Sequence, residues 1–158
     1  MQKITTFLWF NDQAEPAANF YTSIFKNSKV TNVSRYGEGG PGKPGSAMIV
    51  NFELDGQEFM ALNGGPEFKF TEAVSLFVNC ENQAEVDRLW SKLTADGGEE
   101  SMCGWLKDKF GLSWQIVPSD LGHFIGGPDA AGAERAMRAM LQMHKLDLTA
   151  LQKAYEGR

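Results

Sequence analysis

The chain has few of the side chains that bind transition metals tightly, with only two cysteines and two histidines in 158 residues. Cys80 and Cys103 lack a C-x-x-C spacing, so a zinc or redox site of that kind is excluded and free thiols are expected. No apolar run approaches the roughly 20 residues that cross a bilayer. The segment from Met1 to Ile4 enters a strand pattern without signal-peptide features. We therefore expect a cytoplasmic protein with no membrane partner.

The chain also lacks an excess of positive charge. Its 15 lysines and arginines are outnumbered by 20 aspartates and glutamates, which gives a net charge of -5. Nucleic-acid binding depends on clustered basic residues, and those in this chain are scattered, so we expect no nucleic-acid partner. With 42% hydrophobic and 22% charged residues, the composition is typical of a folded globular domain. The length predicts a single domain over residues 1–158.

One segment of the sequence occurs twice, seventy positions apart. An apolar run from Ile4 to Phe10 is followed by Asn11 to Glu15, and a second run from Val74 to Cys80 is followed by Glu81 to Glu85. At the same offset of seventy positions, Phe20 corresponds to Trp90, so an aromatic residue also recurs in the helical segment. A domain built from two similar halves produces such a repeat.

The first half, about 1–65, predicts the order β-α-β-β-β. After the strand Ile4 to Phe10, Asp12 is the expected N-cap of an amphipathic helix. Strands at Lys29 to Tyr36, Ala47 to Leu54 and Glu58 to Leu62 follow, with a glycine-rich loop at 37–45. Between the last two strands, Asp55 and Gly56 predict a tight hairpin turn.

The second half, about 72–118, predicts the same order. Its expected elements are a strand at Val74 to Cys80, a helix at Gln83 to Ala95 and strands at Glu99 to Met102, Trp105 to Asp108 and Leu112 to Val117. Asp108 is expected to support the last turn through bonds to the backbone. Beyond it, about 119–158, Asp129 and Asp147 are expected N-caps. Apolar spacing predicts helices from Ala133 to His144 and after Asp147, with Gly157 in the left-handed conformation at the end.

Several segments resemble the PhnB-like group, often labelled 3-demethylubiquinone-9 3-methyltransferase, of the vicinal oxygen chelate superfamily. They are Phe7 to Phe10, Asn19 to Tyr21, Gly104 to Pro118 and Ala139 to Asp147. The resemblance implies an α+β fold in which two β-α-β-β-β modules form a glyoxalase/bleomycin-resistance-type domain, with additional C-terminal helices. It also implies a homodimer whose modules shape a shared cavity.

The resemblance further implies four metal-binding positions in the superfamily enzymes. Carried onto this chain they fall on Thr5 or Thr6, Ala61, Ser75 and Gln115. Divalent metals favour imidazole and carboxylate donors, whereas these positions offer hydroxyls, a methyl group and a neutral amide. We therefore expect no metal and no cofactor. The S-adenosylmethionine chemistry suggested by the label normally uses a glycine-rich turn before a helix, and no helix follows the loop at 37–45.

Strand alternation places Thr5, Phe7 and Trp9 on one face, with Ser75, Phe77 and Asn79 on the corresponding face of the second half. An aromatic cavity with a few polar points suits a small, partly apolar organic ligand. The expected ligand-binding residues are Trp9, Asn63, Ser75, Phe77, Trp105 and Gln115. The two tryptophans have an alternative role as core residues.

The sequence thus predicts a small-molecule binding protein or a metal-independent enzyme, and it identifies no catalytic residue. Whether the chain is an enzyme is left open. One alternative is a metal-dependent lyase, isomerase or dioxygenase with a displaced site built from Glu58, Glu81 or His123. Another is a genuine methyltransferase.

Overall fold

The computed structural model describes residues 2–158 and divides the chain into two compact units, Met1–Phe70 and Thr71–Arg158. Each unit contains one β-α-β-β-β module, so the predicted α+β class and element order are confirmed. The division falls between the two predicted modules. No helix within residues 2–158 is long and apolar enough to span a membrane.

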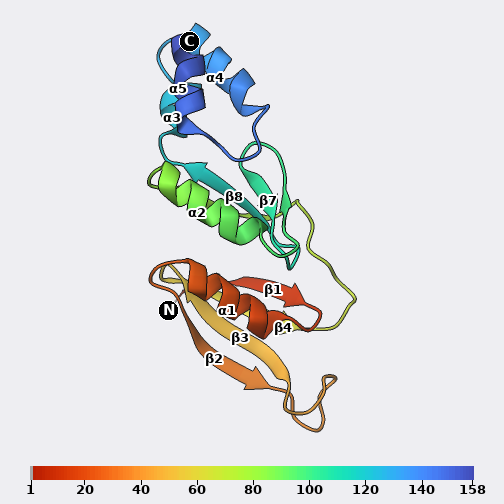
Figure 1. The fold of residues 1–158 in the computed structure, drawn as a ribbon. Helices are drawn as coiled ribbons and strands as arrows, with labels where there is room; N and C mark the ends of the chain where they lie inside the picture. The colour runs from red at the N-terminus through yellow and green to blue at the C-terminus, as the bar shows by residue number, and fades with distance from the viewer. Residues whose placement is uncertain (1) are drawn as a thin grey trace. The chain divides into compact units, whose positions relative to one another are not determined.

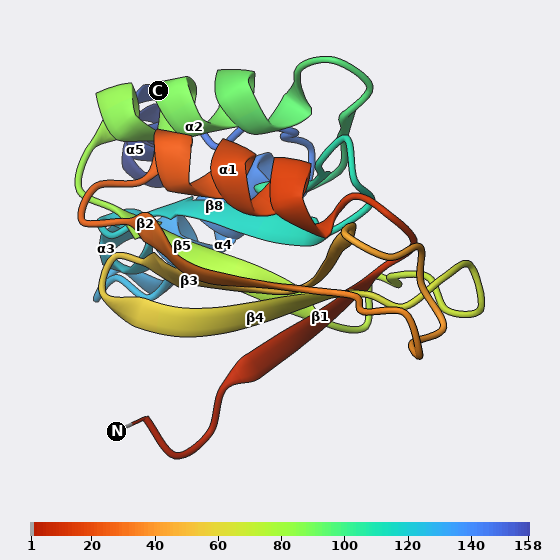
Figure 2. The ribbon, with the colours of Figure 1, turned by 90° about the horizontal axis from the view of Figure 1, so that it is seen from below.

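The first unit is a four-stranded sheet with one helix across it. Its elements are β1 (Thr6–Phe10), α1 (Ala14–Ile24), β2 (Lys29–Arg35), β3 (Ala47–Leu54) and β4 (Gln57–Asn63). The strand order is β1-β4-β3-β2, with β1 parallel to β4 and the other pairs antiparallel. Figure 2 shows α1 lying along one face of this sheet. That face buries Leu8, Phe52 and Ala61 against the helix.

The second unit repeats this arrangement with shorter strands. Its module consists of β5 (Ser75–Cys80), α2 (Gln83–Thr94), β6 (Glu99–Glu100), β7 (Trp105–Lys107) and β8 (Ser113–Pro118). The order β5-β8-β7-β6, with β5 parallel to β8, matches that of the first unit. The core under α2 contains Leu89, Leu93, Trp114 and Ile116, each almost fully buried. The 70-residue repeat therefore reflects two modules of the same topology.

Three helices follow the second module: α3 (Leu121–Ile125), α4 (Ala130–Met140) and α5 (Leu148–Glu156). They pack on one another at the C-terminal end of the unit (Figure 1). The expected N-cap Asp129 directly precedes α4, but the helix stops at Met140, so its predicted extension to His144 is wrong. Met143 and His144 instead accept hydrogen bonds through their carbonyls from the N–H groups of Cys103 and Gly104, at 2.8 Å each. The short helix α3 was not predicted.

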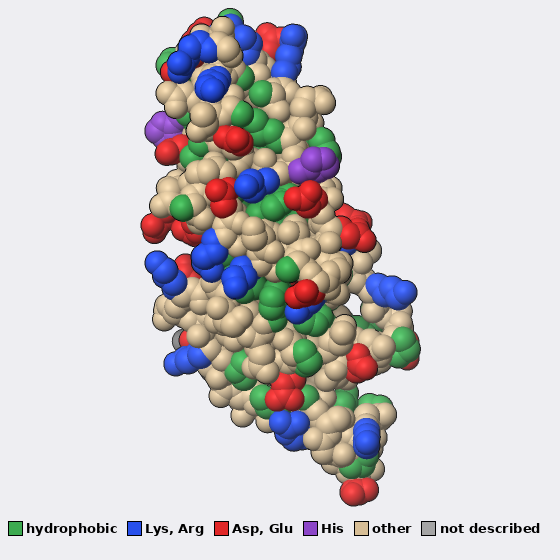
Figure 3. Space-filling model, viewed as in Figure 1, with side chains coloured by type: hydrophobic (Ala, Val, Ile, Leu, Met, Phe, Trp, Pro, Cys, Tyr) green, Lys and Arg blue, Asp and Glu red, His purple; other side chains and the backbone are tan. Residues whose placement is uncertain are grey.

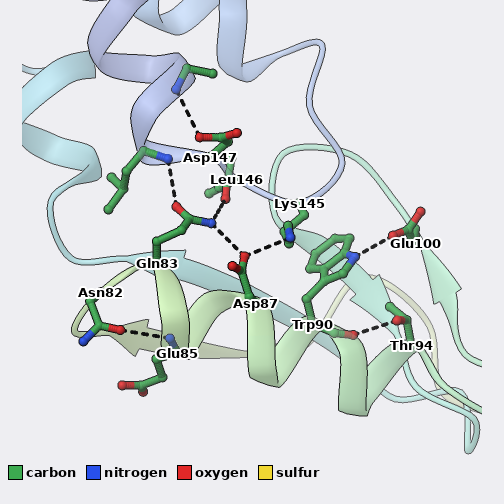
Figure 4. Close-up of polar contacts among 12 residues, drawn as sticks. Asn82, Gln83, Glu85, Asp87, Trp90, Thr94, Glu100, Lys145, Leu146 and Asp147 are labelled. Atoms are coloured by element: carbon green, nitrogen blue, oxygen red, sulfur yellow. Dashed lines mark hydrogen bonds and ion pairs between the residues drawn. The ribbon is translucent and has the colours of Figure 1, made fainter.

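The C-terminal helices are attached to the module through α2, as Figure 4 shows. The Gln83 amide donates to the carbonyl of Leu146 at 2.9 Å and accepts from the Leu148 N–H at 2.8 Å. An ion pair joins Lys145 to Asp87 at 2.8 Å. The carboxylate of Asp147 caps α5 by accepting from the Ala150 N–H, as predicted, and Gly157 ends that helix with a φ of 76°.

The two module helices begin differently. Asn82 caps α2 by accepting from the Glu85 N–H at 2.9 Å. The expected cap of α1 by Asp12 is wrong, because the N-cap position is Gln13 and no side chain there makes the capping bond. The Ala14 N–H is bonded instead to Oδ1 of Asn63 at 2.8 Å. A residue at the end of β4 thus satisfies the start of α1.

Candidate functional site

Four of the predicted ligand-binding residues lie together on one face of the second sheet. Phe77 is paired with Gln115 across β5 and β8, and Gln115 with Trp105 across β8 and β7. Directly opposite residues in a sheet point to the same side, so these three side chains form one row. The next row contains Ser75, Ser113, Lys107 and Glu99. We call the face formed by these seven residues the open face, because α2 covers the opposite side.

Neutral polar groups and an aromatic ring form the centre of the open face. The Gln115 Nε2 donates a hydrogen bond to the Ser75 Oγ at 3.0 Å. Beside this pair, the Phe77 side chain is 53% exposed. A large apolar side chain exposed next to fixed amide and hydroxyl groups matches the usual composition of small-molecule sites.

Trp9 and Asn63, the other two predicted residues, belong to the first unit and have structural partners. The Trp9 indole N–H donates to the Gly65 carbonyl at 2.9 Å, and its ring meets Phe68 edge to face. The Asn63 amide accepts from Ala14 and donates to the Ala47 carbonyl at 3.1 Å. These contacts direct Asn63 toward α1, and ligand binding by either residue stays a prediction.

The metal-binding positions implied by the superfamily do not fit a divalent cation. The predicted position Ala61 is on the wrong face, because it pairs with Leu8 and Val50 and is fully buried under α1. Met60, one residue earlier, is the register partner of Phe7. In the second unit Ser75 and Gln115 offer a hydroxyl and an amide that already bond to each other. None of these groups is a ligand of the type that divalent metals prefer.

The structure brings no further metal-binding side chains to the alternative site built from Glu58, Glu81 or His123. Within the described part of the chain, no three His, Cys, Asp or Glu side chains group closely enough to hold a metal. Figure 3 shows the two histidines far apart on the surface, with acidic and basic side chains intermixed. His123 is in α3, and its Nε2 lies 3.7 Å from the Asp120 carboxylate.

Neither thiol is arranged as a nucleophile. Both cysteines are free, as expected. Burial raises the pKa of Cys80 to about 12, so this thiol stays protonated at neutral pH. Cys103 has a φ of 58° and supports the turn before Gly104, where the chain meets Met143 and His144.

Asp108 has the structural role that the sequence predicted, with one addition. Its carboxylate accepts from the backbone N–H groups of Phe110 and Leu112 at 2.8 and 3.1 Å. The second oxygen accepts from the Trp114 indole N–H at 2.8 Å. With 2% of its surface exposed, Asp108 fixes the β7–β8 turn from inside the core.

Sequence reasoning missed the charged residues at one end of the open face. Lys107 forms an ion pair with Glu72, and Glu99 is its register partner on β6. The hydrogen bond from Lys107 lowers the pKa of Glu72, and the same bond raises the pKa of Lys107. The Glu99–Lys107 pair could have been found from the sequence, because the register of the predicted β6–β7 hairpin places these two residues opposite each other. The contact with Glu72, which precedes the module, has no local pattern.

Comparisons with known proteins agree with this architecture. The family described as 3-demethylubiquinone-9 3-methyltransferase matches residues 2–117. The PhnB protein from Bacillus cereus carries the same methyltransferase name in its description. It is 45% identical to this chain, and the two structures align with a TM-score of 0.69. The alignment covers 74% of this chain and 99% of that one. No curated protein matches.

More distant structures share the fold alone. The protein PA1353 from Pseudomonas aeruginosa is 20% identical, with a TM-score of 0.61 over 75% of this chain and 98% of its own. The fosfomycin resistance protein FosX from Listeria monocytogenes is 14% identical, with a TM-score of 0.51 over 75% and 93%. The predicted glyoxalase/bleomycin-resistance-type fold is therefore confirmed. The chain belongs to the PhnB-like, 3-demethylubiquinone-9 3-methyltransferase family.

Proposed function

We propose that this protein binds a small organic ligand on the open face of the second sheet, either as a binding protein or as a metal-independent enzyme. The observation that carries the proposal is the half-exposed Phe77 beside the Ser75–Gln115 hydrogen bond. Phe77 and Trp105 offer apolar contact, and the free positions of the Ser75 hydroxyl and the Gln115 amide orient polar groups. Such a site needs no metal to hold its ligand.

A thermal-shift screen of small organic compounds tests this proposal. A compound that binds the folded protein at saturating concentration raises the melting temperature by a few degrees, on the order of 3 °C. The Phe77→Ala and Gln115→Leu variants are expected to lose this shift. Gln57→Leu is the matched control, because Gln57 is an exposed residue of the β3–β4 hairpin. Compounds that still raise the melting temperature of both the Phe77→Ala and the Gln115→Leu variants would contradict the proposal.

The two alternative functions have direct tests. Elemental analysis of the purified protein that finds about one zinc, nickel, manganese or iron per chain would support a metal-dependent lyase, isomerase or dioxygenase. Calorimetric titration with S-adenosylmethionine tests the methyltransferase suggested by the family name. The loop at 37–45 joins β2 to β3, so it lacks the following helix that normally binds this cofactor. We therefore expect no binding heat.

We also propose that the protein acts as a homodimer. Phe7 on β1 is 50% exposed, and Ile4 just before the same strand is 86% exposed. Apolar side chains exposed at this edge of the first sheet favour burial by a second copy. Light scattering after size exclusion is expected to give twice the 17.5 kDa of one chain. A mass of a single chain at micromolar concentration would contradict it.

A further inference from the structure

A pocket of about 330 Å³ opens at the β6–β7 end of the open face. Its lining includes Glu72, Glu99, Glu100, Trp105, Lys107 and Ser113. The C-terminal extension supports one wall, because the His144 Nδ1 lies 2.9 Å from the carbonyl of Ser101, which also lines the pocket. The pocket is thus a formed part of the second unit.

Ser113 contributes a hydroxyl that has no partner. Its side chain is 1% exposed, and its Oγ is the one buried side-chain polar atom in residues 2–158 without a hydrogen bond. Strand alternation places it on the same face as Gln115, and its register partner Lys107 lines the same pocket. Buried polar groups are nearly always bonded, so this hydroxyl points to a group that the protein itself does not supply.

The charge around the hydroxyl is negative. Lys107 and Glu72 neutralise each other in an ion pair. Glu100 directs its carboxylate to α2, where it accepts from the Trp90 indole N–H at 2.6 Å, so Glu99 supplies the second carboxylate on the open face. Trp105 presents an indole ring, which attracts cations to its face. The Glu99 carboxylate and an aromatic ring together favour a positively charged group.

We propose that this pocket holds the cationic end of the ligand, a primary ammonium or guanidinium group attached to an apolar body. The N–H groups donate to the Ser113 Oγ and the Glu99 carboxylate, and the charge lies against Trp105. A bare divalent cation fits less well, since no three acidic side chains of residues 2–158 converge on one point. The assignment rests on the proposed function, because the apolar body extends toward Phe77 on the open face.

Three probes that differ in charge test the assignment: benzylammonium, benzyl alcohol and benzoate. Each is titrated into the labelled protein while the indole N–H signals and the Gln115 side-chain amide signals are followed by NMR. The Trp105→Phe and Gln115→Leu variants assign the two signals. Benzylammonium is expected to shift the Trp105 signal and to bind about tenfold more tightly than benzyl alcohol. Glu99→Gln should weaken its binding about threefold or more. Glu134→Gln, which makes the same charge change on the exposed face of α4, should leave it unchanged.

The outcomes separate the two proposals. Equal binding of benzylammonium and benzyl alcohol at the Trp105 and Gln115 signals overturns the cationic assignment and keeps the ligand site. Tighter binding of benzoate likewise overturns it. If none of the probes moves either signal up to about 10 mM, a concentration that detects even weak binding, the cationic assignment fails. The compound screen with Phe77→Ala and Gln115→Leu then decides the proposed function separately.

Discussion

The two modules share a topology but stabilise equivalent points with different residues. Phe10 pairs with Asn63 at the end of β1 and β4, and Cys80 pairs with Pro118 at the same place in the second module. Asn63 bonds the first N–H of α1, whereas Pro118 has no side-chain acceptor and α2 uses its own cap, Asn82. A repeated fold therefore keeps its registers, while its polar contacts change from one copy to the other.

The hairpins that precede the last strands differ in the same way. In the first module Asp55 and Gly56 form an exposed turn with φ values of 49° and 79°. In the second, the turn is held by the buried carboxylate of Asp108. One turn depends on backbone conformation and the other on a buried acceptor. This difference can be measured by the same substitution in both places.

The largest effect is expected from Asp108→Asn. The amide keeps one acceptor but turns a donor toward either the Trp114 indole N–H or the backbone N–H groups, which leaves buried donors unpaired. The free energy of unfolding should fall by about 3 kcal/mol in urea titrations. Asp55→Asn should change it by about 0.5 kcal/mol or less, because Asn tolerates positive φ. Equal losses would show that the two turns do not differ as described.

Asn63→Ala and Asn82→Ala compare the two helix starts. Asn63→Ala removes a partner from both the Ala14 N–H and the Ala47 carbonyl, and should lower the free energy of unfolding by about 2 kcal/mol. Asn82→Ala removes one exposed capping bond and should lower it by about 1 kcal/mol. A smaller loss at Asn63 than at Asn82 would contradict the view that β4 caps α1.

Local patterns in the sequence predicted most of the fold and only part of the site. Apolar periodicity and the Asp55-Gly56 pair specified strands, helices and one turn, because these depend on neighbouring residues. The roles of three other residues depend on which distant parts of the chain lie next to them, and no local pattern contains that information. These residues are Asn63, Gln83 and Ser113. The placement of Ala61 failed by one residue, and a slip of one residue in a strand moves the side chain to the other face.

Gln83→Ala and Gln13→Ala compare two residues that the repeat places in equivalent positions. Gln83 bonds Leu146 and Leu148, so its loss should lower the free energy of unfolding by about 1 kcal/mol. Hydrogen exchange should also become faster in α5. Gln13 occupies the N-cap position without a capping bond from its side chain, and its replacement should cost about 0.5 kcal/mol or less. Unchanged exchange in α5 would show that Gln83 does not attach the C-terminal helices.

The smallest effect is expected from the Asp87–Lys145 ion pair. Hydrogen bonds from Lys145 and then Gln83 lower the pKa of Asp87 from its ordinary value of 3.8. A lowered folded pKa means that the stabilisation is present above this value and is lost as the pH falls through the folded pKa. Both side chains are about half exposed, so the effect should be about 0.5 kcal/mol or less.

The Lys145→Met variant measures this contribution. Its free energy of unfolding should be slightly below that of the unchanged protein near neutral pH, and the difference should shrink below about pH 4 as Asp87 becomes protonated. The repeat places Ala17 at the position of Asp87 in the first module, and an alanine has no charge to pair, which makes the effect specific to the second unit. A difference that persists at low pH would assign the loss to packing of the lysine stem.

The most direct test of the account is a crystal structure of the protein with the compound that gives the largest shift in the thermal screen. The account predicts electron density for that compound against Phe77, Trp105 and Gln115, with a nitrogen near the Ser113 hydroxyl. Density for the compound on the α2 side of the sheet or among the C-terminal helices, with the open face free, would contradict it.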